Sequence, residues 1–186
     1  MSHVRITGGQ ACGQKIRVPD VKMVRPSPDR ARTTLFNWLM PFTQGIRVLD
    51  LYAGSGILSY EALSRGASEA HLVDINKKVN THLNHCAKTW TYGHIHIYLA
   101  DCQKWLLHHA HLGPFDLIFL DPPFHQNTLL QRSLEHIQQQ RYLAKNGFIY
   151  TERAQQAAPP TVSNFSVYRE KRFGTVIGTL YIEKTV

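Results

Sequence analysis

The chain has 186 residues, of which 43% are hydrophobic and 18% are charged, so it can form one α/β domain with a substantial core. The formal net charge is +8 and the sequence pI is near 9.6, which favours an anionic partner such as nucleic acid, although an anionic membrane or an acidic protein would also fit. We recognise no apolar run of membrane-spanning length and no secretory leader, and therefore expect no membrane partner and a cytoplasmic location.

The N-terminal segment is predicted to be a β-hairpin. Residues 3–7 and 15–18 alternate apolar with polar side chains, and residues 8–13 between them are rich in glycine. Its outward face would carry His3, Arg5, Lys15 and Arg17. These positive charges fit a solvated face and a phosphate-binding appendage about equally well. A basic connector follows, so we divide the chain into residues 1–26, the hairpin and connector, and residues 27–186, the main domain.

A helix is predicted to begin near Ser27 and to end before Pro41. Ser27 suits the N-cap position and Pro28 the first helical position. Arg25, Arg30 and Arg32 gather around this helix start. They could bind phosphate groups, or they could pair with acids of the core and fix the helix.

The main domain shows a regular alternation of strands, acids and helices. Buried strands are predicted at 46–51, 70–74, 95–100 and 115–120, with helices at 57–64, 75–90 and 102–110 between them. An aspartate ends or follows each strand: Asp50, Asp74, Asp101 and Asp121. The carboxyl ends of parallel strands meet at one edge of a sheet, where open α/β folds bind ligands, so these four acids predict a single site.

The C-terminal part completes the predicted sheet. A helix is expected at 129–141, a strand at 148–150, and two final strands at 165–169 and 176–182. We expect a mostly parallel sheet closed by an antiparallel hairpin at the C-terminus.

The turn after the first strand indicates which ligand the site binds. Gly54 and Gly56 lie between a strand and a helix N-terminus, which makes a nucleotide-sized site. Ser59 occupies the position of the third glycine of a dinucleotide fingerprint, and Asp50 would repel a pyrophosphate. S-adenosylmethionine fits, because Asp50 can hold its ammonium group, Asp74 its ribose, and Asp101 with the N–H of the next residue its adenine. The candidate cofactor-binding residues are Asp50, Tyr52, Ala53, Gly54, Ser55, Gly56, Asp74, Ile75, Asp101 and Cys102.

The four residues after the strand at 115–120 form the candidate catalytic group: Asp121, Pro122, Pro123 and Phe124. Proline ends the strand, which leaves a carboxylate, backbone carbonyls and an aromatic ring together. The Asp121 carboxylate and the Pro122 carbonyl can accept the two hydrogens of an amine on a flat ring, and Phe124 can stack on that ring. A strand-terminating turn with a capping aspartate is the structural alternative.

These motifs together resemble a known family. Asp50 to Gly56 with Asp121 to Phe124 look like the motifs of class I amino-methyltransferases, which have a Rossmann-like fold. Arg25-Pro26 with Asp29-Arg30 and Arg32 is similar to the N-terminal signature of the RsmD family, bacterial 16S rRNA (guanine-N2)-methyltransferases, and Glu61 to Gly66 also matches. The resemblance implies S-adenosylmethionine as cofactor and 16S rRNA as partner. It also implies a seven-stranded sheet and a monomeric protein. Arg5, Lys15, Arg25, Arg30 and Arg32 are then the candidate RNA contacts.

The chain departs from the family pattern at two positions, and two other functions remain as alternatives. The family often has glutamate where this chain has Thr33, and glutamate in place of Asp74. A DNA adenine-N6 methyltransferase would use the same catalytic residues but usually carries a separate target-recognition region. A non-catalytic RNA-binding module could keep the same fold, although the intact series of acids argues against it.

Metal sites and disulfides are not expected. Three cysteines form no Cys-x-x-Cys pair, so the sequence indicates neither a disulfide framework nor a zinc ribbon. Two histidine-rich clusters are interpreted as solvated helix faces: His82/His85/Cys86 and His108/His109/His111.

Overall fold

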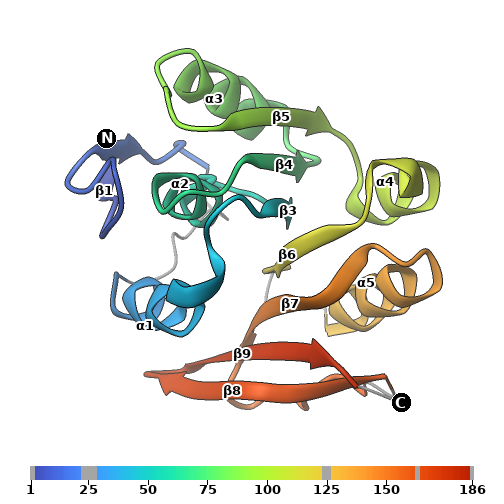
Figure 1. Cartoon of the computed structure of the whole chain (residues 1–186). Helices are drawn as coiled ribbons and strands as arrows, with labels where there is room; N and C mark the ends of the chain where they lie inside the picture. The colour runs from blue at the N-terminus through green and yellow to red at the C-terminus, as the bar shows by residue number, and fades with distance from the viewer. Residues whose placement is uncertain (1–2, 22–28, 123–126, 162–163, 185–186) are drawn as a thin grey trace.

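A mostly parallel sheet of seven strands organises the molecule (Figure 1). The computed structural model describes residues 3–21, 29–122, 127–161 and 164–184. In spatial order the strands are β5 (His94–Leu99), β4 (Glu69–Asp74), β3 (Arg47–Leu51), β6 (Phe115–Leu120), β7 (Leu143–Ala154), β9 (Val176–Glu183) and β8 (Phe165–Phe173). The first five pair in parallel, and β9 and β8 complete the sheet antiparallel. The predicted Rossmann-like class of fold is confirmed.

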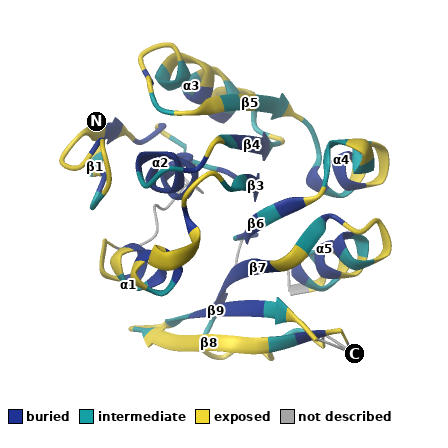
Figure 2. Cartoon of the chain, viewed as in Figure 1, coloured by how far each residue is buried: buried dark blue, intermediate teal, exposed yellow. Residues whose placement is uncertain are grey.

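Helices cover both faces of the sheet. The helices are α1 (Asp29–Leu39), α2 (Ile57–Ser64), α3 (Lys77–Ala87), α4 (Cys102–His108) and α5 (Asn127–Gln139), with short 3-10 turns at Met40–Phe42 and Ala110–Leu112. Alternate residues of β6 belong to different cores: Leu117 and Phe119 pack with α1–α3, and Ile118 and Leu120 pack with α4 and α5. Burial on both faces explains why β6 is almost wholly apolar (Figure 2).

Element boundaries differ from the expectation mainly at the C-terminal strands. β7 begins at Leu143 and reaches Ala154, well beyond the apolar run at 148–150, because pairing with β9 extends it through Ala154. α3 ends at Ala87, three residues earlier than expected. The predicted cap of α1 at Ser27 and Pro28 lies outside the described residues. Across the described ranges, no helix combines the length and apolar character that crossing a membrane requires.

The N-terminal hairpin consists of β1 (His3–Arg5) and β2 (Lys15–Arg17), which pair antiparallel. Its four basic side chains are exposed, as expected for the outward face. Its inner residues Ile6, Ala11 and Ile16 are buried in the same core as α1–α3. The hairpin therefore shares the core of the main domain, and a division at residue 26 remains a prediction.

A buried carboxylate, Glu61 of α2, joins three separate segments of the chain. Its Oε1 accepts a hydrogen bond of 2.6 Å from the backbone N–H of Thr7, which follows β1. The same oxygen lies 3.5 Å from Nε of Arg32 in α1, and Oε2 lies 3.4 Å from Nε of Arg65. Glu61 is 0% exposed and Arg32 is 1% exposed, so these charges compensate each other in the interior.

The hairpin loop is anchored one turn further along α2. Ser64 Oγ donates to the carbonyl of Gly8 at 2.6 Å and accepts from the N–H of Ala11 at 2.9 Å. Gly9 has a φ of +80°, and a Cβ there would overlap the Ser64 carbonyl. Only glycine therefore allows this close approach of loop to helix.

We expect Glu61→Ala to lower the free energy of unfolding by about 3–5 kcal/mol, because it leaves Arg32 and Arg65 without their buried partner. Urea denaturation measures this loss. Glu135→Ala is the matched control, since Glu135 lies exposed on α5 and accepts a hydrogen bond from Gln131. A Glu61→Ala variant as stable as the control would contradict the role given to this network.

Candidate active site

The carboxyl ends of the parallel strands bring the predicted acids to one edge of the sheet. Asp50 is the last residue but one of β3, Asp74 ends β4, and Asp121 directly follows β6. Leu51 pairs with Leu120, so β3 and β6 end at the same level. Asp101 lies two residues after β5 and is the N-cap of α4. The expected alignment of the four strand ends is therefore present.

Asp50 is a buried carboxyl group with one strong hydrogen bond. Its Oδ2 accepts from Ser59 Oγ at 2.6 Å, and the residue is 4% exposed. Burial raises the pKa of Asp50 to about 7, and the charge of Asp74 adds to the increase, against the hydrogen bond from Ser59. A positively charged ligand group beside Asp50 would stabilise its ionised form.

Glu152 of β7 is a fifth acid at this edge, and it is absent from the acids predicted from the sequence. Burial, the charge of Glu152 and the charge of Asp50 raise the pKa of Asp121 well above its usual value. Glu152 itself is 4% exposed and accepts a hydrogen bond of 3.1 Å from Tyr150 Oη. The signal was present, because Glu152 comes shortly after the apolar run at 148–150 and continues the alternation of strand and acid by one strand.

Asp74 fixes the glycine turn in addition to ending β4. Its Oδ2 accepts from the N–H of Gly54 at 3.0 Å, and its Oδ1 accepts from the N–H of Asn76 at 2.8 Å. Burial is the main cause that raises the pKa of Asp74, and these two hydrogen bonds oppose it. Each carboxylate oxygen has a further lone pair, so ribose hydroxyls can still donate to this group.

The glycine turn is conformationally demanding. Gly56 precedes α2 with a φ of +73°, and a Cβ there would lie 2.8 Å from Cδ2 of Leu83. Tyr52 adopts a φ of +68°, which is uncommon for a residue with a side chain. Its hydroxyl lies 3.1 Å from Ser133 Oγ and accepts from Gln103 at 2.9 Å, and these contacts hold the strained backbone in place.

The other predicted cofactor contacts differ in exposure. Ile75 is 66% exposed directly after β4, so an apolar side chain lies open beside Asp74, where a flat base could cover it. Asp101 Oδ1 accepts from the N–H of Lys104 at 3.0 Å and caps α4. Ala53 and Ser55 are buried, which leaves their backbone as the group able to reach a ligand.

Cys102 begins α4 and is 3% exposed. Burial raises the pKa of its thiol to about 12, so the group stays protonated near neutral pH. The thiolate is the nucleophilic form of cysteine, and this residue is therefore unsuited to covalent catalysis.

The catalytic motif is described only in part. Asp121 is half-buried and Pro122 is buried. Pro123 and Phe124 lie outside the described residues, so their predicted stacking on the target base stays a prediction. Arg25 among the RNA candidates lies outside them too.

Arg30 and Arg32 differ in their surroundings, and this difference corrects the prediction that Arg32 contacts RNA. Arg5, Lys15 and Arg30 are exposed, as an RNA contact requires. Arg32 is buried: besides Glu61, its Nη2 lies 3.0 Å from Asp29 and donates to the carbonyl of Arg5 at 2.7 Å. Arg32 therefore fixes α1 and the hairpin, which is the structural alternative left open above, and it does not belong to an RNA-facing surface.

The direction of α1 places its first turn, with Arg30, toward the carboxyl edge of the sheet. Phe36 contacts Phe119 late in β6, whereas Phe42, after the helix, contacts Phe148, which pairs with Leu117 early in β6. The helix thus runs antiparallel to the strands. Its first turn, with Arg30, lies toward the same edge as Asp121.

Comparisons with known proteins show which family the chain is similar to. A family model described as Conserved hypothetical protein 95 matches residues 4–182. The Ribosomal RNA small subunit methyltransferase D of Escherichia coli strain K12 is 38% identical over 180 residues, which cover 96% of this chain and 89% of that protein. The protein of the same name from Haemophilus influenzae is 34% identical, with 96% of this chain and 93% of that protein covered.

A solved structure extends the likeness to three dimensions. The Escherichia coli protein yhhF superimposes with a TM-score of 0.89 at 36% identity, over 100% of both chains. The match therefore includes the N-terminal hairpin, the glycine turn and the C-terminal strands. This chain belongs to the RsmD family, whose family model is described as Conserved hypothetical protein 95.

Proposed function

We propose that this protein methylates the exocyclic N2 amine of a guanine in 16S rRNA, with S-adenosylmethionine as methyl donor. The observation that carries the proposal is the set of buried and half-buried carboxyl groups at the carboxyl edge of the sheet. Among the described residues, no lysine or arginine forms an ion pair with Asp50, Asp74 or Asp121. A ligand with a positive charge would offset their mutual repulsion.

The chemistry of the donor set fits S-adenosylmethionine. When bound, this cofactor supplies an electrophilic methyl group on a positively charged sulfur. Asp50 would hold the ammonium group of its methionine part, directly or through water, and Asp74 would accept from the ribose hydroxyls. The exposed side chain of Ile75 would cover one face of the adenine, beside the N-terminus of α4.

Asp121 and Pro122 would orient the target amine. The lone pair of a guanine N2 amine is delocalised into the ring, so the amine is a poor nucleophile. Accepting both hydrogens at the Asp121 carboxylate and the Pro122 carbonyl turns that lone pair toward the methyl group and stabilises positive charge that develops on nitrogen. The methylated amine must then lose one proton, and the raised pKa of Asp121 suits this residue to take it.

The choice of rRNA as substrate rests on the named relatives and on charge. Both relatives named above are called small-subunit rRNA methyltransferases. The net charge of +8 and the exposed Arg5, Lys15 and Arg30 favour a polyanion. Transfer of tritium from labelled S-adenosylmethionine into immature small ribosomal subunits, naked 16S rRNA and DNA tests the proposal, followed by identification of the modified nucleoside. Label in adenine of DNA, or no transfer at all, would refute it.

We expect Asp121→Asn to reduce kcat by a factor on the order of 10²–10³, because the group that accepts the amine hydrogen loses its charge. Cofactor affinity measured by calorimetry should stay close to that of the wild type. Burial and the charges of Glu152 and Asp50 penalise the ionised aspartate, so the melting temperature should not fall. A variant that turns over at the wild-type rate would rule out this catalytic role.

Cofactor affinity is expected to depend on pH through Asp50. Its pKa near 7 means that the group is largely protonated below that pH, and a bound ammonium group would lower the pKa. Affinity should therefore rise with pH, by about fifteenfold between pH 5.5 and pH 7 if one proton is released on binding. Calorimetry at several pH values measures this slope. Asp50→Asn should flatten the slope, and an unchanged slope in that variant would assign the titration to another group.

Arg30→Ala and Arg32→Ala form a matched pair on one helix. Arg30→Ala should weaken RNA binding and make its salt dependence shallower by about one unit of slope, because one phosphate contact is lost. Its melting temperature should not change. Arg32→Ala should instead destabilise the fold by about 3–5 kcal/mol, because buried Glu61 loses a partner. Filter binding at several salt concentrations and thermal denaturation separate the two, and a wild-type salt slope for Arg30→Ala would place the RNA contacts elsewhere.

A further inference from the structure

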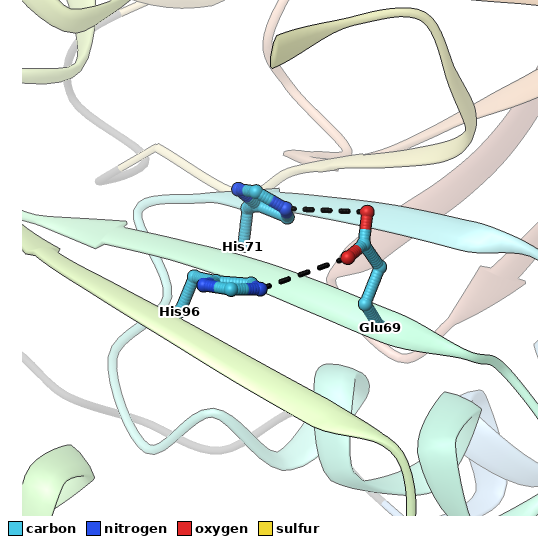
Figure 3. Close-up of side chains that lie close together, drawn as sticks. All are labelled: Glu69, His71 and His96. Carbon is cyan, nitrogen blue, oxygen red and sulfur yellow. Dashed lines mark ion pairs between the residues drawn. The ribbon is translucent and has the colours of Figure 1, made fainter.

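A second group of polar side chains lies on β4 and β5, away from the carboxyl edge of the sheet. Glu69 is the first residue of β4, His71 follows two residues later on the same strand, and His96 pairs with His71 across to β5. One ligand atom from each of the three residues lies within 4.8 Å of the others. Figure 3 shows both imidazole rings directed at the carboxylate of Glu69.

The two distances to Glu69 resemble those between ligands of one metal ion. His71 Nε2 lies 3.5 Å from Oε1, and His96 Nε2 lies 3.6 Å from Oε2. Zinc bonds to nitrogen and oxygen of 2.0–2.1 Å in a tetrahedron separate neighbouring ligand atoms by about 3.3 Å. These distances reach the two different oxygens of Glu69, and the three ligand atoms lie within 4.8 Å of one another, so the side chains must approach by up to about 1.5 Å to enclose such an ion.

His71 provides an independent observation that points to a ligand. It is 3% exposed, and its Nε2, which is directed at the group, makes no well-formed hydrogen bond, since its contact with Glu69 Oε1 is 3.5 Å long. Its other nitrogen, Nδ1, lies 3.1 Å from the hydroxyl of Tyr98. A proton on Nδ1, donated to Tyr98, leaves the Nε2 lone pair free, and metal-bound histidines commonly make such a bond through their second nitrogen.

Arg47 is a positively charged group beside Glu69 that would repel a bound metal ion. Its Nε lies 2.5 Å from Glu69 Oε1, and its two other nitrogens donate to the carbonyls of Pro114 and Leu112 at 2.8 Å each. These backbone bonds hold the guanidinium on one side of the carboxylate. The other oxygen, Oε2, faces His96 and is therefore available as a ligand of the ion. The nearby charge of Arg47 would weaken binding of the ion.

We propose that Glu69, His71 and His96 bind a Zn²⁺ ion that ties the edge strand β5 to β4. Two imidazoles and one carboxylate are a ligand set that zinc accepts, with water in the fourth position. The His96 side chain is 46% exposed, which gives the ion a path from solvent. Asp50 and Asp121 take no part, so the proposal is independent of the methyl-transfer site.

Zinc titration of the full-length protein, first stripped with a chelator, tests the site. Calorimetry should show one equivalent of Zn²⁺ bound, and the melting temperature should rise with zinc concentration because the ion binds only the folded chain. Cobalt(II) in place of zinc should give the visible absorption of a four-coordinate ion. Wild-type protein that takes up no equivalent of zinc would overturn the proposal.

Substitutions assign the ion to these residues. His96→Gln should weaken zinc binding at least tenfold and abolish the rise in melting temperature, and Glu69→Gln should do the same. His96 is half exposed on an edge strand, so His96→Gln should fold, which thermal denaturation with chelator present verifies. His85→Gln is the control, since it removes an exposed histidine on α3. Wild-type affinity in His96→Gln, or an equal loss in His85→Gln, would refute the assignment.

Discussion

Electrostatic repulsion among buried carboxyl groups is the constraint on which the candidate active site depends. Asp50, Asp121 and Glu152 lie near the carboxyl ends of three neighbouring strands, and besides burial the charges of Glu152 and Asp50 raise the pKa of Asp121, as the charge of Asp74 does for Asp50. Such an arrangement opposes folding near neutral pH, because burial favours the protonated acids. The parallel strands with their large apolar cores offset this cost. A positively charged ligand would then find a preorganised set of acceptors.

Glu61 is the instructive contrast within the same core. It is more deeply buried than the acids of the site, and Arg32, Arg65 and the N–H of Thr7 satisfy it. Its role is to hold α1, α2 and the hairpin together. Burial of a carboxylate therefore says little by itself about function in this molecule, and the partners of each carboxylate distinguish structural acids from candidates for ligand binding.

Local patterns in the sequence determined the class of fold and the positions of most residues that we propose to bind the cofactor. The alternation of apolar strands with acids predicted β3 to β6 and the position of Asp50, Asp74, Asp101 and Asp121, because strand ends in a parallel sheet share one edge. Gly54 and Gly56 marked the turn for the same local reason, since their positive φ angles are properties of single residues.

Only the tertiary structure decided which charged residues are paired and which face solvent. Arg30 and Arg32 are two residues apart and alike in sequence, but one is exposed and the other is buried against Glu61. Glu69, His71 and His96 converge only through the register of β4 on β5. Pairing and burial depend on segments far apart in the chain, so no local pattern contains them, whereas the strand and turn signals lie within a few consecutive residues.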